Sequence, residues 1–429
     1  MTDSSPARPT TSQMLAIFWR IGILSFGGPA AQISVMHREL VDERGWLTEK
    51  QFLNALSFCM LLPGPEAMQL ATYAGWKLNG WRGGLIGGLL FVLPGAAVIF
   101  ALAALYVAFG NVPLVYAIFF GVQCAVLVIV LQALRKVAGR ALNGWPAWAI
   151  ALAAFIGLYF LAVPYPLIVF AAALVGFFFL ASSEALERVE RPKLAAISGT
   201  FLLWGALWLV PLAVLYAMAP DGILARIGLF FSQLAVVTFG GAYAVLAYIA
   251  QDVVTNFGWL TQGQLIDALG LAETTPGPLI LVTQFVGFLA AAGSPELGGL
   301  AWGFAGGAVA LWVTFVPCFL WIFAGAPYIE WIAAQPRLKS ALDAITAAVV
   351  GVIAYLSVWF AIHVLFGHLV RVEQGFFEFD WSLLSTARPA AFVLFIIAAI
   401  MAFALKWGMG RVLLVSAVLG VLVVRFLTI

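Results

Sequence analysis

Two short motifs rich in glycine and proline occur twice in the chain, and they are the residues best suited to binding a ligand. Phe26-Gly27-Gly28-Pro29 returns as Phe239-Gly240-Gly241-Ala242, and Pro63-Gly64-Pro65 returns as Pro276-Gly277-Pro278, each at an offset of 213 residues. Glycine tolerates tight turns, and proline suits the first turn of a returning helix. Free backbone N–H groups at the start of a helix attract anions. The motifs therefore predict turns that bind a compact oxyanion rather than a cation or an apolar ligand.

Polar side chains beside these turns have two interpretations. The hydroxyls of Ser25, Thr238 and Thr275 and the amide of Gln69 could donate hydrogen bonds to an anion, but serine and threonine in membrane helices often bond only to their own backbone. Arg20 either attracts the anion or extends toward the membrane surface. The candidate substrate-binding residues are Arg20, Ser25, Phe26, Gly27, Gly28, Pro29, Pro63, Gly64, Pro65, Gln69, Thr238, Phe239, Gly240, Gly241, Thr275, Pro276, Gly277 and Pro278.

Two carboxylates flank the Pro-Gly-Pro motifs: Glu66 directly follows the first, and Glu273 lies three residues before the second. An ionised carboxylate would repel an anion, so each is a candidate proton carrier that is neutral when the anion is bound. Stabilisation by the dipole of its own helix is the alternative for Glu66. The sequence shows no metal-ligand cluster, no Ser/His/Asp grouping and no P-loop. We therefore expect no metal, no cofactor and no enzymatic step.

The composition places these residues in a membrane. The chain has 429 residues, of which 64% are hydrophobic and only 9% are charged, whereas about a quarter of the residues in a soluble protein are charged. The charge-free run 83–134 alone has 52 residues, and a helix needs roughly 20 to cross a bilayer. A soluble enzyme, a nucleic-acid-binding protein and a secreted disulfide scaffold are excluded. Cys59, Cys124 and Cys318 lie singly in apolar surroundings and are interpreted as packing residues.

The paired motifs belong to a longer internal repeat. Residues 26–65 and 239–278 are identical at 15 of 40 positions, including a Gly-Trp-Leu-Thr segment between the two motifs. Beyond Pro65 the register changes, and Pro94 matches Pro317 at an offset of 223. We predict an N-terminal repeat over 1–181, a linker with one extra transmembrane helix over 182–219, and a C-terminal repeat over 220–429.

Basic residues indicate the side of the membrane on which each loop lies. With the N-terminus inside and one extra span between the repeats, 16 of the 21 lysine and arginine residues fall in inner segments, 4 fall in outer segments, and Arg20 lies within a helix. This bias arises only if equivalent loops of the two repeats face opposite sides, which predicts inverted topology. Full spans are expected near 83–109, 113–134, 145–161, 165–181, 194–218, 299–325, 341–366, 389–405 and 412–427.

Both motifs are expected at the tips of re-entrant hairpins. The segments 48–62 and 66–79 have 15 and 14 residues, and at about 1.5 Å per residue neither spans the roughly 30 Å hydrocarbon core. The same argument applies to 14–28 and 30–43; pairs of ordinary kinked spans are the alternative. The expected fold is an all-α polytopic membrane protein with two inverted repeats, each with two re-entrant hairpins and about four full spans. Inverted repeats with broken helices are typical of secondary transporters.

The paired motifs at this spacing resemble the chromate transporter family in its long, two-domain form, over essentially the whole chain. The second copy has Ala242 where the family pattern has proline, so the start of that helix departs from the pattern. The resemblance implies a bacterial plasma (inner) membrane carrier that exports chromate and confers chromate resistance, without an enzymatic step. Export would be driven by the membrane potential, with proton exchange as an option.

Sulfate or another oxyanion remains an alternative substrate, and an anion channel remains an alternative mechanism. The expected partners are the oxyanion and the lipid bilayer, with no nucleic acid, and a homodimer is left open.

Overall fold

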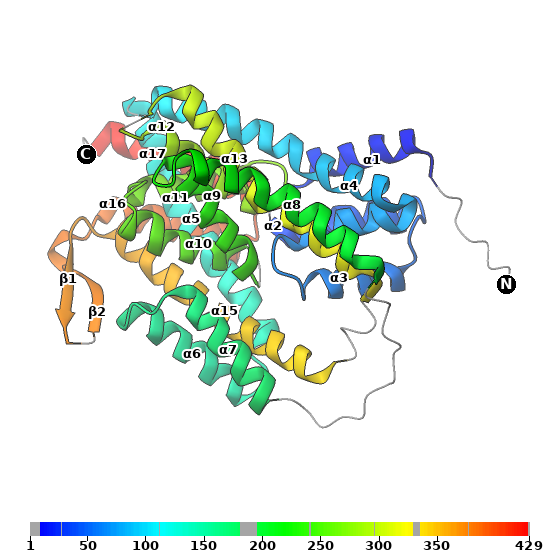
Figure 1. The fold of residues 1–429 in the computed structure, drawn as a ribbon. Coiled ribbons are helices and arrows are strands. Elements are labelled where there is room, and N and C mark those ends of the chain that lie inside the picture. Colours follow the sequence, from blue (N-terminus) through cyan, green and yellow to red (C-terminus); the bar gives the residue numbers. More distant parts are fainter. Residues whose placement is uncertain are drawn as a thin grey trace. The chain divides into compact units, whose positions relative to one another are not determined.

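The computed structural model describes residues 9–26, 28–110, 112–180, 195–239, 242–295, 297–328, 335–375 and 377–427. The described chain is helical apart from its turns and one β-hairpin (Figure 1). It forms two compact units, and each unit contains segments from both sequence repeats. The first comprises Met1–Val107, Ala185–Ala242 and Ala272–Gln335, and the second comprises Ala108–Glu184, Tyr243–Leu271 and Pro336–Ile429. The compact units therefore do not coincide with the sequence repeats.

The first unit contains both Pro-Gly-Pro motifs and the ends of the helices that precede both Phe-Gly-Gly motifs. Its helices are α1 (Thr11–Leu24), α2 (Gly28–His37), α3 (Glu49–Cys59), α4 (Glu66–Phe109), α8 (Ala195–Met218), α9 (Ile223–Val237), α12 (Val282–Ala292) and α13 (Leu300–Gly325), with a π-helical turn at Arg38–Asp42 and 3₁₀ turns at Leu279–Leu281 and Ala326–Tyr328.

The second unit contains the remaining helices and the hairpin. Its elements are α5 (Pro113–Ala141), α6 (Trp145–Phe160), α7 (Tyr165–Phe179), α10 (Ala242–Ile249), α11 (Gln262–Thr274), α15 (Pro336–Leu365), β1 (Leu369–Gln374), β2 (Phe377–Ser382), α16 (Pro389–Ala399) and α17 (Met409–Leu427), with π-helical turns at Ala250–Asn256 and Ile400–Ala404 and a 3₁₀ turn at Leu384–Thr386. The boundary between the units falls at Leu271, so the last turn of α11 belongs to the first unit.

The repeated Gly-Trp-Leu-Thr segment starts a helix in both copies. Before α3, the Thr48 side chain accepts a hydrogen bond from the Gln51 backbone N–H, and the Gln51 side chain accepts one from the Thr48 N–H. Thr261 and Gln264 make the same pair before α11. Such a capping box satisfies two N–H groups that a helix start leaves free. Helix initiation therefore explains why this segment has the same sequence in both repeats.

The helix that leaves the first Pro-Gly-Pro motif is short, as predicted. Within α4 the backbone leaves the helical region at Asn79 and at Gly80, which has φ 57°. The first part of α4 therefore ends at the residue expected from the sequence, and 81–109 forms a separate long helix. In the second copy the same two helices are α12 and α13, joined by the longer connection 293–299. This longer connection, together with an earlier start of α13, accounts for the change of offset from 213 to 223.

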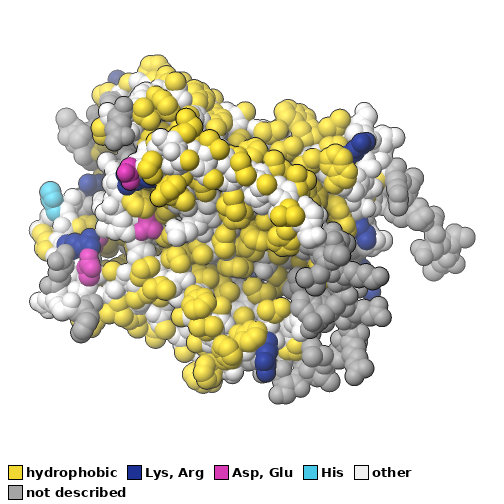
Figure 2. Space-filling model, in the orientation of Figure 1, with side chains coloured by type: hydrophobic (Ala, Val, Ile, Leu, Met, Phe, Trp, Pro, Cys, Tyr) yellow, Lys and Arg dark blue, Asp and Glu magenta, His cyan; other side chains and the backbone are white. Residues whose placement is uncertain are grey.

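The lengths and surfaces of the helices identify a multi-pass membrane protein. Six helices are long and apolar enough to cross a bilayer, and α6, α7 and the continuous helix 389–404 are shorter apolar helices. All nine predicted spans are thus helical. Large apolar side chains face outward on them, with Phe179 82% and Leu202 74% exposed, and hydrophobic side chains cover most of the face in Figure 2. In water this surface would be unfavourable, whereas lipid solvates it.

The β-hairpin is a difference between the two repeats. The equivalent helices α5 and α6 are joined by residues 142–144, whereas α15 and α16 are joined by residues 366–388, which include β1 and β2. The strands pair antiparallel, with Arg371 opposite Asp380. The hairpin was not expected from the apolar composition.

Candidate functional site

Both Pro-Gly-Pro turns pair crosswise with the other repeat in the first unit. The backbone N–H of Gly64, in the first Pro-Gly-Pro motif, donates to the carbonyl of Thr238 at 2.8 Å, at the end of α9. The N–H of Gly277, in the second, donates to the carbonyl of Ser25 at 2.9 Å, at the end of α1. Gly64 and Gly277 are equivalent in the repeat, and so are Ser25 and Thr238. Each Pro-Gly-Pro turn is therefore hydrogen-bonded to the residue that precedes the Phe-Gly-Gly motif of the other repeat.

A second pair of contacts repeats this reciprocity. A Cβ atom on Gly95 would lie 2.1 Å from the carbonyl oxygen of Pro276, and one on Gly64 would lie 3.1 Å from the sulfur of Cys318. Gly95 and Cys318 are equivalent at the offset of 223, and each follows a helix-kinking proline, Pro94 or Pro317. The proline-containing part of each long helix thus packs on the other repeat's Pro-Gly-Pro turn. The sequence had suggested only a packing role for Cys318 and none for Gly95.

The turns lead into helices near the predicted positions. Helix α2 begins at Gly28, α4 at Glu66 and α10 at Ala242, while the second Pro-Gly-Pro motif opens into the 3₁₀ turn Leu279–Leu281 before α12. The first N–H groups of a helix have no acceptor within that helix. Three of the predicted site residues, Gly27, Gly240 and Gly241, lie outside the described residues.

The predicted hydroxyl donors are engaged with their own backbone. Ser25 donates to the Ile21 carbonyl at 2.6 Å, Thr238 to Leu234 at 2.5 Å, and Thr275 to Ala272 at 3.1 Å. All three side chains are buried. The interpretation in which these residues bond only to their own helices therefore describes this structure, and an anion would have to be bound by other groups or after these bonds are exchanged.

Buried glutamines hold the turns. Gln69 donates from Nε2 to the Pro63 carbonyl at 2.7 Å, and Gln32 donates from Nε2 to the Gly277 carbonyl at 2.7 Å. Their exposed fractions are 0% and 1%. Gln69 was predicted to donate to the anion, but its amide N–H is bonded to the turn. Gln32 was missed because it is one polar residue, the fifth of α2, and only the fold brings it to Gly277.

Arg20 is occupied by an ion pair. Its Nε lies 3.3 Å from Oε1 of Glu39, and Nη1 of Arg44 lies 2.6 Å from Oε2 of the same carboxylate. The Glu39 side chain is fully buried, whereas that of Arg20 is 51% exposed. The structure therefore places Arg20 in a charge cluster that joins α1 to the π-helical turn after α2.

The other predicted residues of the site differ in their exposure. Glu273, Pro65 and the second Pro-Gly-Pro motif are buried, Glu66, Pro29, Pro63 and Phe239 are half-buried, and Phe26 is exposed. Groups of three or more histidine, cysteine or carboxylate side chains placed to hold a metal do not occur among the described residues.

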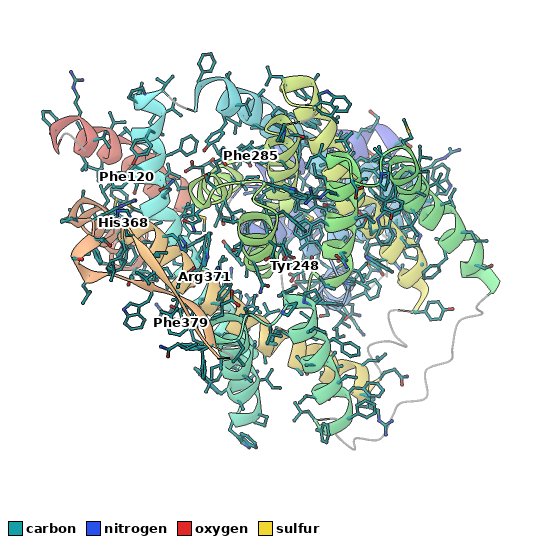
Figure 3. The ribbon with its side chains drawn as sticks, turned by 60° about the vertical axis from the view of Figure 1, so that its left-hand side comes forward. Phe120, Tyr248, Phe285, His368, Arg371 and Phe379 are labelled. Carbon is teal, nitrogen blue, oxygen red and sulfur yellow. The ribbon has the colours of Figure 1, made fainter. Side chains whose placement is uncertain are left out.

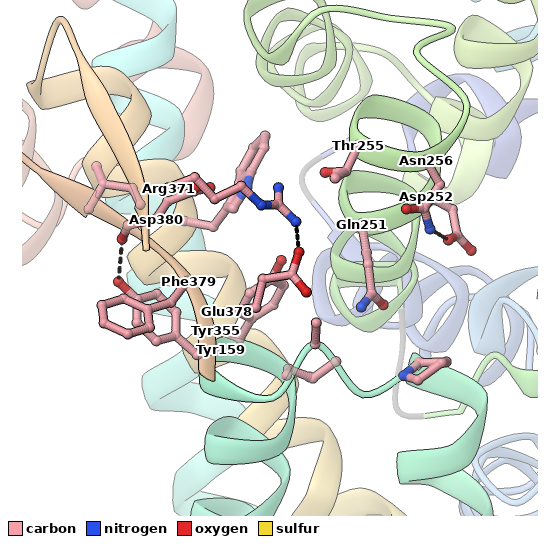
Figure 4. A pocket seen from close by; sticks show the side chains of 15 residues that line it. Tyr159, Gln251, Asp252, Thr255, Asn256, Tyr355, Arg371, Glu378, Phe379 and Asp380 are labelled. Carbon is pink, nitrogen blue, oxygen red and sulfur yellow. Dashed lines mark hydrogen bonds and ion pairs between the residues drawn. The ribbon is translucent and has the colours of Figure 1, made fainter. Parts of the chain in front are cut away.

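The second unit contains a polar cavity beneath the hairpin, with a volume of about 290 Å³ (Figure 4). Arg371 and Glu378 form an ion pair in it, and Figure 3 shows Arg371 projecting from the hairpin. Asp380 and Asp252 also line it. Burial raises the pKa of Asp252 although Asn256 donates a hydrogen bond to it. With three carboxylates and one paired guanidinium, this cavity does not favour an anion, and the crossed turns remain the candidate anion site.

Comparisons with known proteins identify the family of the chain. A family model described as "Chromate transporter" matches residues 12–177 and 225–422. The chain is 33% identical over 344 residues to a probable chromate transport protein of Synechococcus elongatus, covering 80% of this chain and 82% of that protein. It is 34% identical over 361 residues to a chromate transport protein of Pseudomonas aeruginosa, covering 82% and 81%. No solved structure matches the chain.

Proposed function

Because this chain belongs to the chromate transporter family, we propose that it carries chromate or a similar tetrahedral oxyanion across the bacterial plasma membrane. The observation that carries the proposal is the crossed pairing in which the Pro-Gly-Pro turn of each repeat is hydrogen-bonded to the end of the helix before the Phe-Gly-Gly motif of the other repeat, within the unit that also contains the starts of α2 and α4 and the 3₁₀ turn before α12. Helix starts of this kind bind anions. A transporter needs no catalytic group, and no enzymatic step is proposed.

The crossed turns are proposed to bind the anion through their backbone. The glycines allow close approach, and the adjoining helix starts supply N–H groups. Glu66 and Glu273 flank the turns and are proposed as alternative proton carriers. Since the hydroxyls of Ser25, Thr238 and Thr275 and the Arg20 guanidinium have protein partners, they are given a supporting role.

Two inverted repeats, 1–181 and 220–429, joined by the linker 182–219, are proposed as the architecture. The family model matches two segments and omits 178–224, which contains α8. Within the second unit, hydrogen bonds also join segments that are predicted to lie on the same side of the membrane. Tyr159, near the outer end of its predicted span, bonds to Asp380, and Gln251 bonds to Val163, both on the side expected outside. Ser340 bonds to Leu180 at ends expected inside. These contacts support the inverted assignment, in which the short helix pairs of the first unit are re-entrant.

Labelling from the two sides of the membrane tests the inverted topology. Single cysteines at Lys50 and at Gly263, which are equivalent in the repeat, are expected to react with an impermeant maleimide from opposite faces, Lys50→Cys from inside and Gly263→Cys from outside. The native cysteines Cys59, Cys124 and Cys318 are buried and serve as the unreactive background. Reaction of both positions from one face would contradict inversion.

The membrane potential supplies the proposed driving force. One elementary charge moved through 100 mV is worth about 2.3 kcal/mol, so export of a dianion from a negative interior gains roughly 4.6 kcal/mol. Export thus needs no ATP and would lower the chromate concentration inside the cell, which is the basis proposed for resistance. Proton exchange through Glu66 or Glu273 is an addition to this scheme rather than a requirement.

Transport of labelled chromate into inside-out vesicles tests the proposal. At equal pH on both faces, an inside-positive potential is expected to drive chromate into the lumen, and valinomycin with balanced potassium should abolish the accumulation. Vesicles without the protein are the control. Accumulation indifferent to the potential would contradict electrogenic export, and stronger transport of labelled sulfate than of chromate would identify sulfate as the substrate.

A further inference from the structure

Three buried glutamines of the first unit each retain an acceptor without a partner. The Nε2 groups of Gln32, Gln69 and Gln284 donate to the carbonyls of Gly277, Pro63 and Ala96. Because a carbonyl can only accept, these bonds fix which end of each amide is nitrogen. Among the described residues, Oε1 of all three lacks a hydrogen-bond donor, and each side chain is at most 1% exposed. A buried unsatisfied acceptor costs about 1–3 kcal/mol, so a donor from a ligand or water is expected there.

Gln69 and Gln32 each hydrogen-bond a Pro-Gly-Pro turn, Gln69 to Pro63 and Gln32 to Gly277, both at 2.7 Å. A Cβ atom on Gly64 would lie 2.9 Å from Gln69 Nε2, and one on Gly277 would lie 3.2 Å from Leu281. Gln69 is therefore in contact with the central glycine of its turn, whereas Gln32 is not among the groups nearest to the corresponding Cβ position of Gly277. Both turns thus have a buried amide oxygen nearby, but of the two side chains Gln69 is the one packed directly against the Cβ position of the glycine of its turn. The first turn is therefore the better placed of the two to accept a hydrogen bond from a ligand.

Charge near the turns also disfavours a fully ionised dianion. The sequence has no lysine or arginine from 51 to 76 or from 227 to 336, the two segments that contain the Pro-Gly-Pro motifs, whereas Glu66 and Glu273 lie within them. Arg20 is paired with Glu39. Removing a charge from water without an opposite charge is costly, and the cost rises steeply with the charge. A site formed by backbone dipoles and an amide suits a monoanion better than a dianion.

We propose that the turns bind the oxyanion in a form that retains one hydroxyl group, which donates a hydrogen bond to Oε1 of Gln69 while backbone N–H groups hold the unprotonated oxygens. The inference rests on the proposed function and specifies its substrate as hydrogen chromate, a monoanion, so the charge moved per anion, and with it the gain from the membrane potential, is half that of the dianion considered above. Chromate keeps a substantial hydroxyl-bearing fraction near neutral pH, whereas sulfate is fully deprotonated there. The Gln69 acceptor thus selects chromate over sulfate by protonation, since sites that hydrogen-bond a hydroxyl reject analogues without one.

Competition between two oxyanions of equal charge measures how much the hydroxyl group contributes to binding. At pH 8, phosphate is mostly a dianion with one hydroxyl, and sulfate is a dianion with none, while both are tetrahedral. Phosphate is expected to inhibit labelled chromate transport at least tenfold more strongly than sulfate in vesicles containing the full chain. Gln69→Met, which keeps the side-chain length but removes the acceptor, should abolish this preference. Gln132→Met is the matched control, because Gln132 also donates to a backbone carbonyl, that of Ala402, and should keep the preference.

A second measurement, the accumulation ratio, reports the charge of the transported anion. At a fixed potential and equal pH, the accumulation ratio for a monoanion is the square root of that for a dianion. Equal inhibition by phosphate and sulfate, or the ratio of a dianion, would overturn the inference while chromate transport itself remained. Absence of chromate transport in the wild type at every pH would instead contradict the proposed function. If Gln69→Met fails to reach the membrane, the wild-type comparison and the charge ratio still decide the inference.

Discussion

Replacing Gly64 or Gly277 with valine is expected to abolish chromate transport while the protein remains in the membrane. Both glycines have positive φ, 116° and 88°, a region in which a β-branched residue is strongly strained. A Cβ atom on Gly64 would also lie 2.9 Å from the Gln69 amide and 3.1 Å from the Cys318 sulfur. The substitution therefore displaces the turn from the carbonyl of Thr238 and separates the crossed pair. Transport should fall by at least a hundredfold in either variant.

Gly375→Val is the matched control for these variants. Gly375 has φ 62° in the hairpin, and a Cβ atom there would meet nothing within 4 Å. It thus reproduces the backbone strain without touching the turns, and transport should remain near the wild-type level. Membrane amount and melting temperature in detergent show whether each variant folds. Normal transport by folded Gly64→Val and Gly277→Val proteins would mean that the turns only shape the helix bundle.

Loss of the Glu39 carboxylate is expected to destabilise the first unit strongly. The side chain is fully buried and pairs with Arg44 at 2.6 Å and Arg20 at 3.3 Å. Glu39→Ala would leave the partly buried Arg44 without its main counter-ion, and breaking a buried ion pair on one side costs on the order of 3 kcal/mol. The fall in melting temperature in detergent measures the effect.

Glu43→Ala provides the comparison within the same cluster. Glu43 contacts Arg38 and Arg44, but its side chain is 42% exposed, and exposed pairs contribute about 0–1 kcal/mol. The Glu43→Ala variant should therefore have a melting temperature close to that of the wild type. Equal melting temperatures for Glu39→Ala and Glu43→Ala would show that the buried carboxylate does not hold α1 in place. Recovery of stability in Glu39→Gln would assign the effect to shape rather than charge.

The helices could be predicted from sequence because their signals are local. Long charge-free runs specify membrane helices, and a Pro-Gly-Pro turn interrupts them wherever it occurs. The end of the half-helix at Asn79 follows from the adjacent Gly80, and the Thr48 and Thr261 caps follow from glutamines three residues on. Such features depend on neighbours within one or two turns, so the sequence specifies them without knowledge of the fold.

The candidate site could be predicted only as a set of separate turns. The contacts of Gly64 with Thr238 and of Gly277 with Ser25 join segments that are distant in the chain, and no local pattern indicates that the repeats exchange partners. The roles of Gln32 and Arg20 also depend on the packing of the helices. Gln32 donates a hydrogen bond to the Gly277 carbonyl, and Arg20 forms an ion pair with Glu39. The hairpin arises from a connection of 23 residues, 366–388, in one repeat only, where the composition indicates polarity but not strand pairing.

The most direct test of the crossed turns as the anion site is equilibrium binding of labelled chromate to the purified full chain in detergent. The account predicts saturable binding to the wild type and to Gly375→Val, and loss of that binding in folded Gly64→Val and Gly277→Val. Undiminished binding of chromate by either folded turn variant would contradict it.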